Sequence, residues 1–415
     1  MTDSNNGILI KSHDKLRDDG VVEFLISSVG YVKRNFEVKK AEYLLLIDED
    51  IRLESKEKIV YNGAESGTIY KIAGYAPMPE QLQRLNEISS KEKYDIYRFD
   101  NVFVDNNMQL VRTKTSKHVL PMGVGNINDD HPKERRWCTR KAGSRLKLPT
   151  VIKNRVSDRG DLEIEVGFLL GAARDRSINP CTWRTENLPK LRLYEYVKGN
   201  VNKEVELVFL GEISERQRAT LSAMGYDPND VITTENKSMD INSLFVPEYP
   251  MRIRDGQFSV LDSDLRWVRN KMISNMSLDN PHTARKIYVS RETANRRKIT
   301  NEDEIVSLLD QYGFEKIEPA NLSLEDEISI FNTADVILGL HGANMAGIVF
   351  AENARVLELF PKGGVCEHYF AIANQLDLSY DCFICETSKE QSRGRHKDIT
   401  VNKDKLVDFI NYNNG

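Results

Sequence analysis

Long hydrophobic runs and an export signal are both missing from this sequence of 415 residues. The N-terminus has no basic stretch followed by an apolar one, so we expect no signal peptide. Apolar runs such as those at 43–47 and 336–340 have the length of a strand, whereas a membrane-spanning helix needs roughly 20 such residues. We therefore expect a soluble cytoplasmic protein. A peripheral association with a membrane is compatible with this composition, although the sequence shows no anchor for it.

An excess of positive charge and a cysteine framework are also missing. Acidic residues number 63 against 58 basic ones, for a net charge of −5. Proteins that bind the nucleic-acid backbone usually carry a basic excess, so we expect no nucleic-acid partner. The five cysteines are an odd number, which favours reduced thiols. Cys382 and Cys385 form one CxxC, but a zinc site needs a second pair of ligands and none lies nearby. We interpret these two as buried strand cysteines.

What the sequence does contain is the composition of a globular chain, 40% hydrophobic and 29% charged, with the length of two domains. Residues 1–150 hold short apolar stretches between polar clusters, with a hairpin turn at 105–107, and predict a β-rich N-terminal elaboration. Residues 151–260 alternate strand and helix patterns. They predict an N-terminal Rossmann-like domain with a parallel sheet.

Residues 261–415 predict a second, C-terminal Rossmann-like domain, entered through a hinge at 249–282 that prolines and a glycine punctuate. Apolar residues between 305 and 312 fall at helical spacing after a start at Asn301 that resembles a capping box. Ser323 predicts the N-cap of a further helix. The predicted fold class is therefore α/β, with two Rossmann-like domains and a β-rich N-terminal elaboration.

The segment 339–347 directly follows a predicted strand of this second domain. In open α/β sheets, ligands bind beyond the carboxyl ends of the strands. Gly342 and Ala343 leave the backbone accessible, and the helix that begins near Asn344 offers free N–H groups and a positive dipole end to a diphosphate. His341 can donate a hydrogen bond to a phosphate oxygen or to a leaving group.

A second group of candidates follows the predicted strand at 286–290. Arg291 lies at its end and residues 296–298 add three cations, so that a guanidinium here can clamp a pyrophosphate. Glu358 is a lone acid in an apolar strand run and needs a partner, either a ribose hydroxyl or a Lys or Arg. His341 and the cations, each taken alone, are more often structural or solvated surface groups, whereas Glu358 alone fits a ribose contact and a structural salt bridge equally well. Their joint placement at strand ends of one domain indicates a ligand site.

Four segments of the second domain resemble glycosyltransferase family 61, the DUF563 group. They read KIYVSR at 286–291, RKITNE at 297–302, DVILGLHGANM at 335–345 and VLELFP at 356–361, and the match extends over about 286–385. This family includes protein O-linked GlcNAc transferases, plant xylosyltransferases and bacterial capsule-type enzymes. The resemblance implies a GT-B fold, inversion at the anomeric carbon and a nucleoside-diphosphate sugar held by the C-terminal domain. It implies donor-contacting roles for Arg291, His341, Gly342 and Glu358.

A weaker resemblance to the same family lies upstream, where residues 179–190 form an aromatic segment that runs into Leu-Pro and a basic residue. The family usually has a histidine just before the aromatic residue. This sequence has Thr182 there, ahead of Trp183. Either another residue has taken over the role of that histidine, or the chain handles its acceptor differently.

Inverting transfer needs a base for the acceptor hydroxyl and positive groups for the departing diphosphate. Arg291, His341 and the helix that follows Gly342 are the candidates for the second task. For the base we favour Glu186 slightly over Asp175, and the reading that both are surface carboxylates is equally well supported by the sequence.

Two DxD triplets, at 48–50 and 262–264, resemble the metal-binding pairs of GT-A enzymes. Such triplets are frequent in a chain with 63 acids, and the second one fits a helix N-cap. We expect neither a metal nor a cofactor, because cations and a helix dipole can neutralise a leaving diphosphate and the nucleotide sugar is a co-substrate.

We expect an inverting glycosyltransferase that moves a hexosyl or pentosyl unit to a glycan or glycolipid acceptor, in surface polysaccharide assembly. Two alternatives stay open: an enzyme like the polysaccharide pyruvyl transferases, and a non-catalytic glycan-binding pseudoenzyme, which Thr182 suggests. An NAD-dependent oxidoreductase is disfavoured because no GxGxxG follows a predicted strand. The oligomeric state leaves no sign in the sequence.

Overall fold

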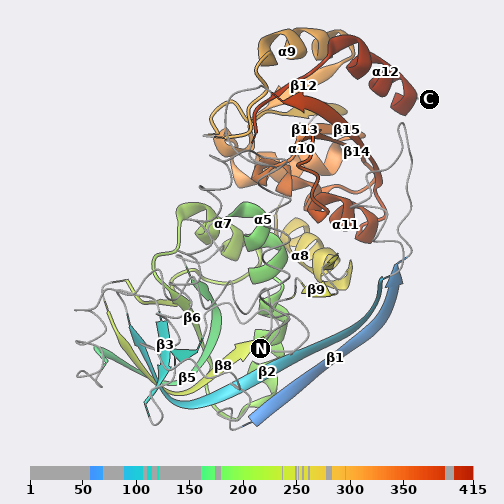
Figure 1. Cartoon of the computed structure of the whole chain (residues 1–415). Coiled ribbons are helices and arrows are strands. Elements are labelled where there is room, and N and C mark those ends of the chain that lie inside the picture. Colours follow the sequence, from blue (N-terminus) through green and yellow to red (C-terminus); the bar gives the residue numbers. More distant parts are fainter. Residues whose placement is uncertain are drawn as a thin grey trace, which may run out of the picture.

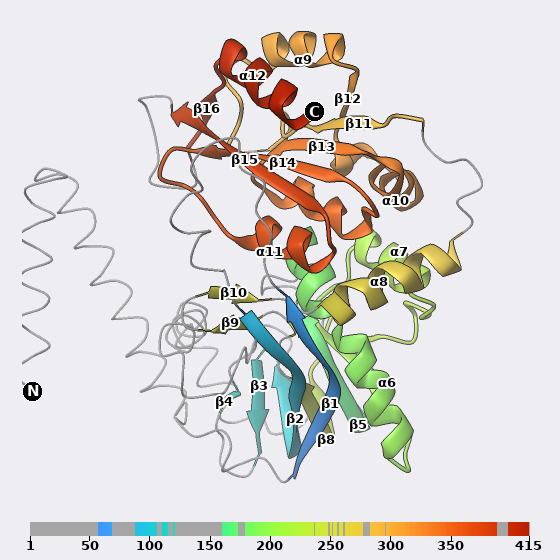
Figure 2. The same cartoon turned by 90° about the vertical axis from the view of Figure 1, so that its right-hand side faces the viewer.

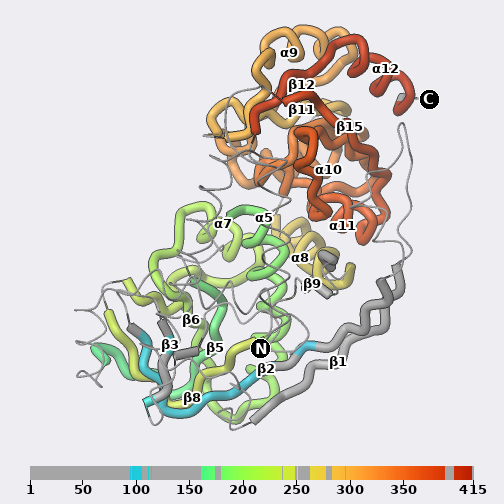
Figure 3. Tube along the Cα trace, in the orientation of Figure 1, coloured from blue at the N-terminus to red at the C-terminus, as the bar shows by residue number. Residues whose placement is uncertain are grey.

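The computed structural model describes residues 57–68, 88–105, 110–114, 119–120, 160–172, 179–235, 237–247, 250, 252–254, 257–259, 262–276, 283–294, 296–387 and 397–414. They form two β-sheets with helices, and helix α8 (Asp262–Asn275) lies between the two (Figures 1 and 3). The predicted α/β class is confirmed. No helix in the described part of the chain combines the length and the apolar character that crossing a bilayer requires.

The first sheet has the strand order β4-β3-β2-β8-β5-β6-β7, with β1 paired to β2. Its strands are β1 (Glu57–Thr68), β2 (Ile88–Asp105), β3 (Leu110–Thr113), β4 (Val119–Leu120), β5 (Leu162–Ala172), β6 (Glu206–Leu210), β7 (Ile232–Thr233) and β8 (Met239–Pro247). Strands β8, β5, β6 and β7 are parallel, as the alternating pattern predicts. Strand β2 pairs antiparallel with β8, so the described strands before residue 150 extend this sheet.

The second sheet has the order β12-β11-β13-β14-β15-β16 and is parallel except for β16. Its strands are β11 (Lys286–Val289), β12 (Phe314–Ile317), β13 (Val336–Leu340), β14 (Arg355–Pro361), β15 (Ser379–Thr387) and β16 (Ile399–Thr400). The first five follow the 2-1-3-4-5 order of flavodoxin-like doubly wound sheets. The order in which strands are added to the sheet reverses between the parallel strands β11 and β13, and ligands of such sheets bind at this switch point.

Helices cover both faces of the second sheet (Figure 2). On the outer face, α9 (Glu302–Gln311) and α12 (Lys403–Asn414) bury apolar side chains against Leu338 and Leu357. On the inner face, α10 (Leu324–Thr333) and α11 (His368–Gln375) belong to a buried cluster that also contains residues of the first sheet. One apolar core therefore connects the two sheets.

Most predicted helix signals are confirmed. Ser323 caps α10 by accepting a hydrogen bond from the N–H of Asp326 at 3.0 Å. Gly313, which follows α9, has a φ of +77° that favours glycine. The predicted capping box at Asn301 is wrong, since this side chain does not cap α9. Its oxygen instead accepts from the N–H of Val401 at 3.0 Å and its amide donates to the carbonyl of Val401 at 2.9 Å, because the chain after β16 passes beside it.

The predicted hairpin turn at 105–107 joins two strands that do pair antiparallel, with Asp105 opposite Leu110. The turn residues between them lie outside the described part of the chain. One of the helical segments between residues 151 and 260 consists of three consecutive pieces. These are α5 (Pro180–Thr182), a π-helical turn η3 (Trp183–Asn187) and α6 (Lys190–Asn200), with Pro189 at the start of α6.

Candidate active site

His341 and Glu358 form a buried pair at the carboxyl ends of β13 and β14. Nδ1 of His341 lies 2.6 Å from Oε1 of Glu358, and the hydroxyl of Tyr380 donates to Oε2 of Glu358 at 2.6 Å. Glu358 is fully buried. Within the protein, the lone acid therefore has a histidine and a tyrosine as partners, and not the Lys or Arg considered from the sequence.

The environment of this pair controls its protonation. Burial raises the pKa of Glu358 to about 8, although the hydrogen bond from Tyr380 and the charge of Arg297 act in the opposite direction. The His341 ring stacks on Phe360 with 5.2 Å between ring centroids. Because Nδ1 faces the carboxyl group and one ring face is covered, the imidazole is held in one orientation.

Arg291 extends from the end of β11 across Gly342. A Cβ on Gly342 would overlap the guanidinium of Arg291, so only glycine permits this approach. Arg291 is 8% exposed, and its Nε and Nη2 each lie 3.4 Å from a carbonyl oxygen, those of Arg297 and Arg296. Among the described residues no carboxylate lies within ion-pair distance of it.

This buried guanidinium still carries its charge at neutral pH. Burial, and after it the nearby charge of Arg297, lower the pKa of Arg291 to about 10. A cation that is removed from water without an opposite charge destabilises the fold, unless a ligand supplies that charge. Arg291 is therefore suited to an anion that arrives from outside the described residues.

The glycine loop, residues 339–347, meets the end of β11 through Asn344. The side-chain amide of Asn344 donates to the carbonyl of Ser290 at 2.8 Å. Ala343 and Asn344 are half-buried and open a 3₁₀ helix, η5 (Ala343–Phe350), where the sequence predicts a short helix. The two predicted groups, one after each strand, are thus brought together at the switch point of the sheet.

The arginine loop, residues 291–298, is anchored by the chain that enters β16. The N–H of Lys298 donates to Asp398 at 2.8 Å, and Ile299 forms a parallel bridge with Ile399. Arg297 has a φ of +59°, a left-handed conformation that is uncommon for a residue other than glycine. The position of the arginines therefore depends on contacts with residues about 100 positions later in the chain.

Segment 179–188 packs against the glycine loop from the side of the first sheet. Helix α5 contacts η5, and the thiol of Cys181 contacts the hydroxyl of Tyr369. That hydroxyl donates to the carbonyl of Gly342 at 2.7 Å. Thr182, where the family usually has a histidine, is buried. Glu186 is 1% exposed, so its interpretation as a surface carboxylate is wrong.

Of the remaining predicted acids, the structure describes the triplet 262–264. Asp175 and the triplet 48–50 lie outside the described residues. Asp264 accepts hydrogen bonds from Tyr94 and, at 2.9 Å, from Arg192, which ties the start of α8 to the first sheet. Within the described ranges, no three His, Cys, Asp or Glu side chains are grouped as a metal site requires.

Tyr369 and Tyr380 are the site residues that the sequence does not single out. Both fall inside apolar patterns and read there as core residues, and both are buried. Their hydroxyls, however, hold Gly342 and Glu358. A buried tyrosine needs a hydrogen-bond partner, and this is the signal that could have indicated them.

Part of this chain is similar to known glycosyltransferases. Residues 182–357 match the family model of Glycosyltransferase 61. Two rice (Oryza sativa subsp. japonica) proteins named alpha-1,3-arabinosyltransferase, XAT3 and XAT2, are 39% identical over 75 residues and 34% identical over 85 residues. These matches cover 17% and 20% of this chain, and 13% and 14% of the rice proteins.

A third relative is the EGF domain-specific O-linked N-acetylglucosamine transferase of Drosophila melanogaster, 31% identical over 77 residues, which are 18% of this chain and 15% of the fly protein. The chain thus matches about one seventh of the length of each of these relatives. The family model covers Glu186, Arg291 and the glycine loop, and it ends one residue before Glu358. The resemblance predicted from the sequence is confirmed over residues 182–357, which match the model of glycosyltransferase family 61.

Proposed function

We propose that this chain is an inverting glycosyltransferase of GT-B type that takes its sugar from a nucleoside-diphosphate sugar. The observation that carries the proposal is Arg291, a buried cation without a described carboxylate partner that lies across Gly342 at the switch point of a doubly wound sheet. A diphosphate bound there supplies the missing negative charge. We further propose that the acceptor is a glycan or a glycolipid and that the transfer takes part in surface polysaccharide assembly.

The proposed reaction is a single displacement. The acceptor hydroxyl oxygen forms a bond to the anomeric carbon, while the bond from that carbon to the β-phosphate oxygen breaks and its electron pair leaves with the nucleoside diphosphate. Arg291, the N–H groups at the start of η5 and an N–H of His341 stabilise the negative charge on the departing oxygens. Glu358 acts through His341, whose ring it orients. No metal is needed for this distribution of charge.

The proton of the acceptor hydroxyl requires a base. We assign this role to Glu186, since it lies in the family region on the segment that packs against the glycine loop. Glu186→Gln keeps the size of the side chain and removes the base. We expect unchanged donor binding with a loss of turnover of 100-fold or more, because general base catalysis contributes roughly 10²–10⁴-fold.

The test is a screen of UDP-, GDP-, CMP- and dTDP-sugars by thermal shift and by release of nucleoside diphosphate, with and without EDTA. The UDP-linked set includes arabinose, xylose and N-acetylglucosamine. A sugar nucleotide at ten times its Kd raises the free energy of unfolding by about 1.4 kcal/mol. We expect one nucleotide class to stabilise the protein, and EDTA to change nothing.

The decisive variant is Arg291→Gln, with Arg285→Gln as control because Arg285 forms an exposed ion pair with Asp335. Loss of charge-assisted hydrogen bonds worth about 1.5–3 kcal/mol weakens donor binding roughly 10- to 100-fold. The same variant should be as stable as the wild type without ligand, or more stable, since a buried unpaired cation is removed. Donor binding that survives in Arg291→Gln contradicts the proposal.

The same screen distinguishes the two alternative functions. Phosphoenolpyruvate as the only stabilising ligand favours a pyruvyl transferase, and donor binding without turnover favours a pseudoenzyme.

A further inference from the structure

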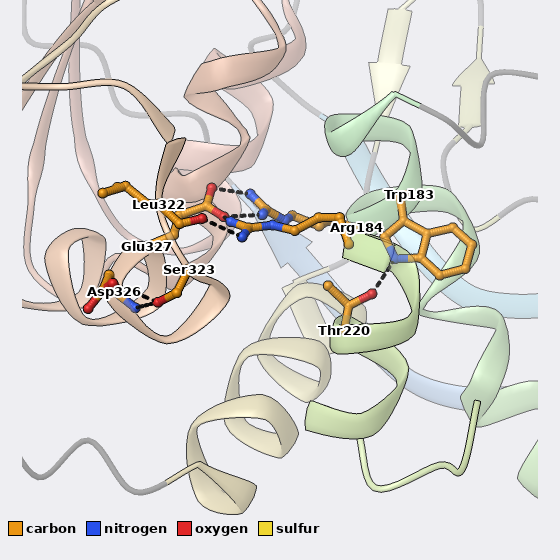
Figure 4. A network of polar contacts seen from close by, with 8 residues as sticks. Trp183, Arg184, Thr220, Leu322, Ser323, Asp326 and Glu327 are labelled. Atoms are coloured by element: carbon orange, nitrogen blue, oxygen red, sulfur yellow. Dashed lines mark hydrogen bonds and ion pairs between the residues drawn. The ribbon is translucent and has the colours of Figure 1, made fainter. Parts of the chain in front are cut away.

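Two arginines and one glutamate, from three different elements, meet between the two sheets (Figure 4). Glu327 of α10 is 2% exposed. Both its oxygens accept from Arg184 of η3, from Nη1 at 2.8 Å and from Nη2 at 2.6 Å. Arg216, from α7 (Glu215–Ala223), also donates to Oε2 of Glu327.

The excess positive charge of this group has further partners on the side of the second sheet. Arg216 donates to the carbonyl of Leu322 at 2.7 Å, directly before the cap of α10. The guanidinium of Arg184 lies 4.9 Å from the ring centroid of Phe350, the last residue of η5. Arg184 therefore connects η3 both to α10 and to the helix that the glycine loop begins.

Trp183, the residue before Arg184 in η3, is held to α7 instead. The indole N–H of Trp183 donates to the hydroxyl of Thr220 in α7 at 2.7 Å. Consecutive residues thus hold η3 to α7 on one side and to α10 on the other. Apolar side chains of similar size could fill this space without the desolvation of three charges, so stability alone does not explain the group. The two parallel hydrogen bonds between Arg184 and Glu327 fix the orientation of η3 relative to α10, which apolar packing does not do.

We propose that Arg184, Glu327 and Arg216 are positioning residues, whose ion pairs set the placement of segment 179–188 against the glycine loop. The inference rests on the proposed function, because the segment carries Glu186 and the loop carries the donor groups. In this role Arg184, Glu327 and Arg216 affect the reaction without touching the donor or the acceptor. A shift of the segment by one ångström then lowers turnover while donor binding remains.

The test separates this role from simple stabilisation by replacing the pair with apolar residues. Single removal of Glu327 leaves two arginines without their counter-charge and is expected to destabilise the fold, so it is not informative alone. Arg184→Met combined with Glu327→Leu keeps the volume and leaves Arg216, whose side chain is 36% exposed, able to reach water. Arg285→Gln is the control for loss of an exposed arginine pair.

Three measurements are made on the double variant: the melting temperature, the thermal shift with the sugar nucleotide that stabilises wild type, and the rate of nucleoside diphosphate release. We expect a melting temperature within a few degrees of wild type, an unchanged donor-induced shift and a release rate at least tenfold lower. A release rate within twofold of wild type, in a folded variant that binds donor, overturns the proposal.

Amide hydrogen exchange, measured without ligand, tests the placement of segment 179–188 even if the proposed donor is wrong. We expect exchange at least tenfold faster at 183–188 in the double variant, with exchange in β13 and β14 unchanged. Unchanged exchange at 183–188 also overturns the proposal. If no sugar nucleotide binds wild type while exchange at 183–188 accelerates, the donor assignment fails and the placement of the segment by these ion pairs stands.

Discussion

Among single residues, Gly342 is the one whose lack of a side chain matters most. Its φ of 168° is extended backbone that any residue can adopt, so glycine is required here for space and not for conformation. Gly342→Ala should displace the guanidinium of Arg291. We expect donor affinity to fall about tenfold or more, the equivalent of one charge-assisted hydrogen bond. The fold should remain stable.

The matched control for this substitution is Gly199→Ala in α6, where a new Cβ meets nothing within 4 Å. Alanine at that helical position should stabilise the protein by about 0.5–1 kcal/mol and leave donor affinity unchanged. Calorimetric titration with the donor measures both variants. Equal affinities in the two variants contradict the role assigned to Gly342.

Glu358 predicts a pH dependence of stability. Its pKa is about 8 in the folded protein, against an ordinary value of 4.5. Between these values the folded state holds a proton that the unfolded state has lost, so stability is greatest at low pH and declines as pH rises. Glu358→Gln does not titrate. We expect the melting temperature of wild type, relative to this variant, to decline steadily from about pH 5 to pH 8, whereas a constant difference argues for an ordinary pKa.

At the scale of elements, the arginine loop depends on the strand that supports it. Asn301 makes two hydrogen bonds to Val401, and Asn301→Ala removes both. We expect a loss of about 1–3 kcal/mol of stability and a several-fold weaker donor affinity, because the loop that carries Arg291 loosens. Asn402→Ala is the control, since Asn402 accepts from the N–H of Lys405 and supports only the start of α12. It should cost about 1 kcal/mol without affecting the donor.

Some helices, strands and contacts could be predicted from the sequence, and others could not. The helices and strands of the second sheet were predictable because their apolar residues have clear periods and their caps are local. The placement of residues 291 and 341–344 at strand ends was predictable for the same reason, since each follows such a strand. The partners of Glu358 and Asn301 were not predictable, because Tyr380 and Val401 reach them only after the sheet is assembled. The pairing of β2 with β8 was not predictable either, because it joins segments that lie far apart in the sequence.

At the scale of the whole molecule, the two sheets share one apolar core. Phe168 of the first sheet and Phe331 of α10 belong to the same buried cluster. We therefore expect a single cooperative unfolding transition for the described parts of both sheets in calorimetry, and expect donor binding to shift all of it. Two separate transitions, of which only one responds to the donor, contradict this expectation.

The bridge between Ile299 and Ile399 has a consequence for how the protein folds during its synthesis on the ribosome. Synthesis adds roughly 5–20 residues per second, and N-terminal parts fold first. The loop that carries Arg291 therefore waits several seconds for its support, because about 100 further residues must be made before the two isoleucines can meet. We expect a nascent chain that has completed the glycine loop to lack the proposed donor affinity until β16 has been made.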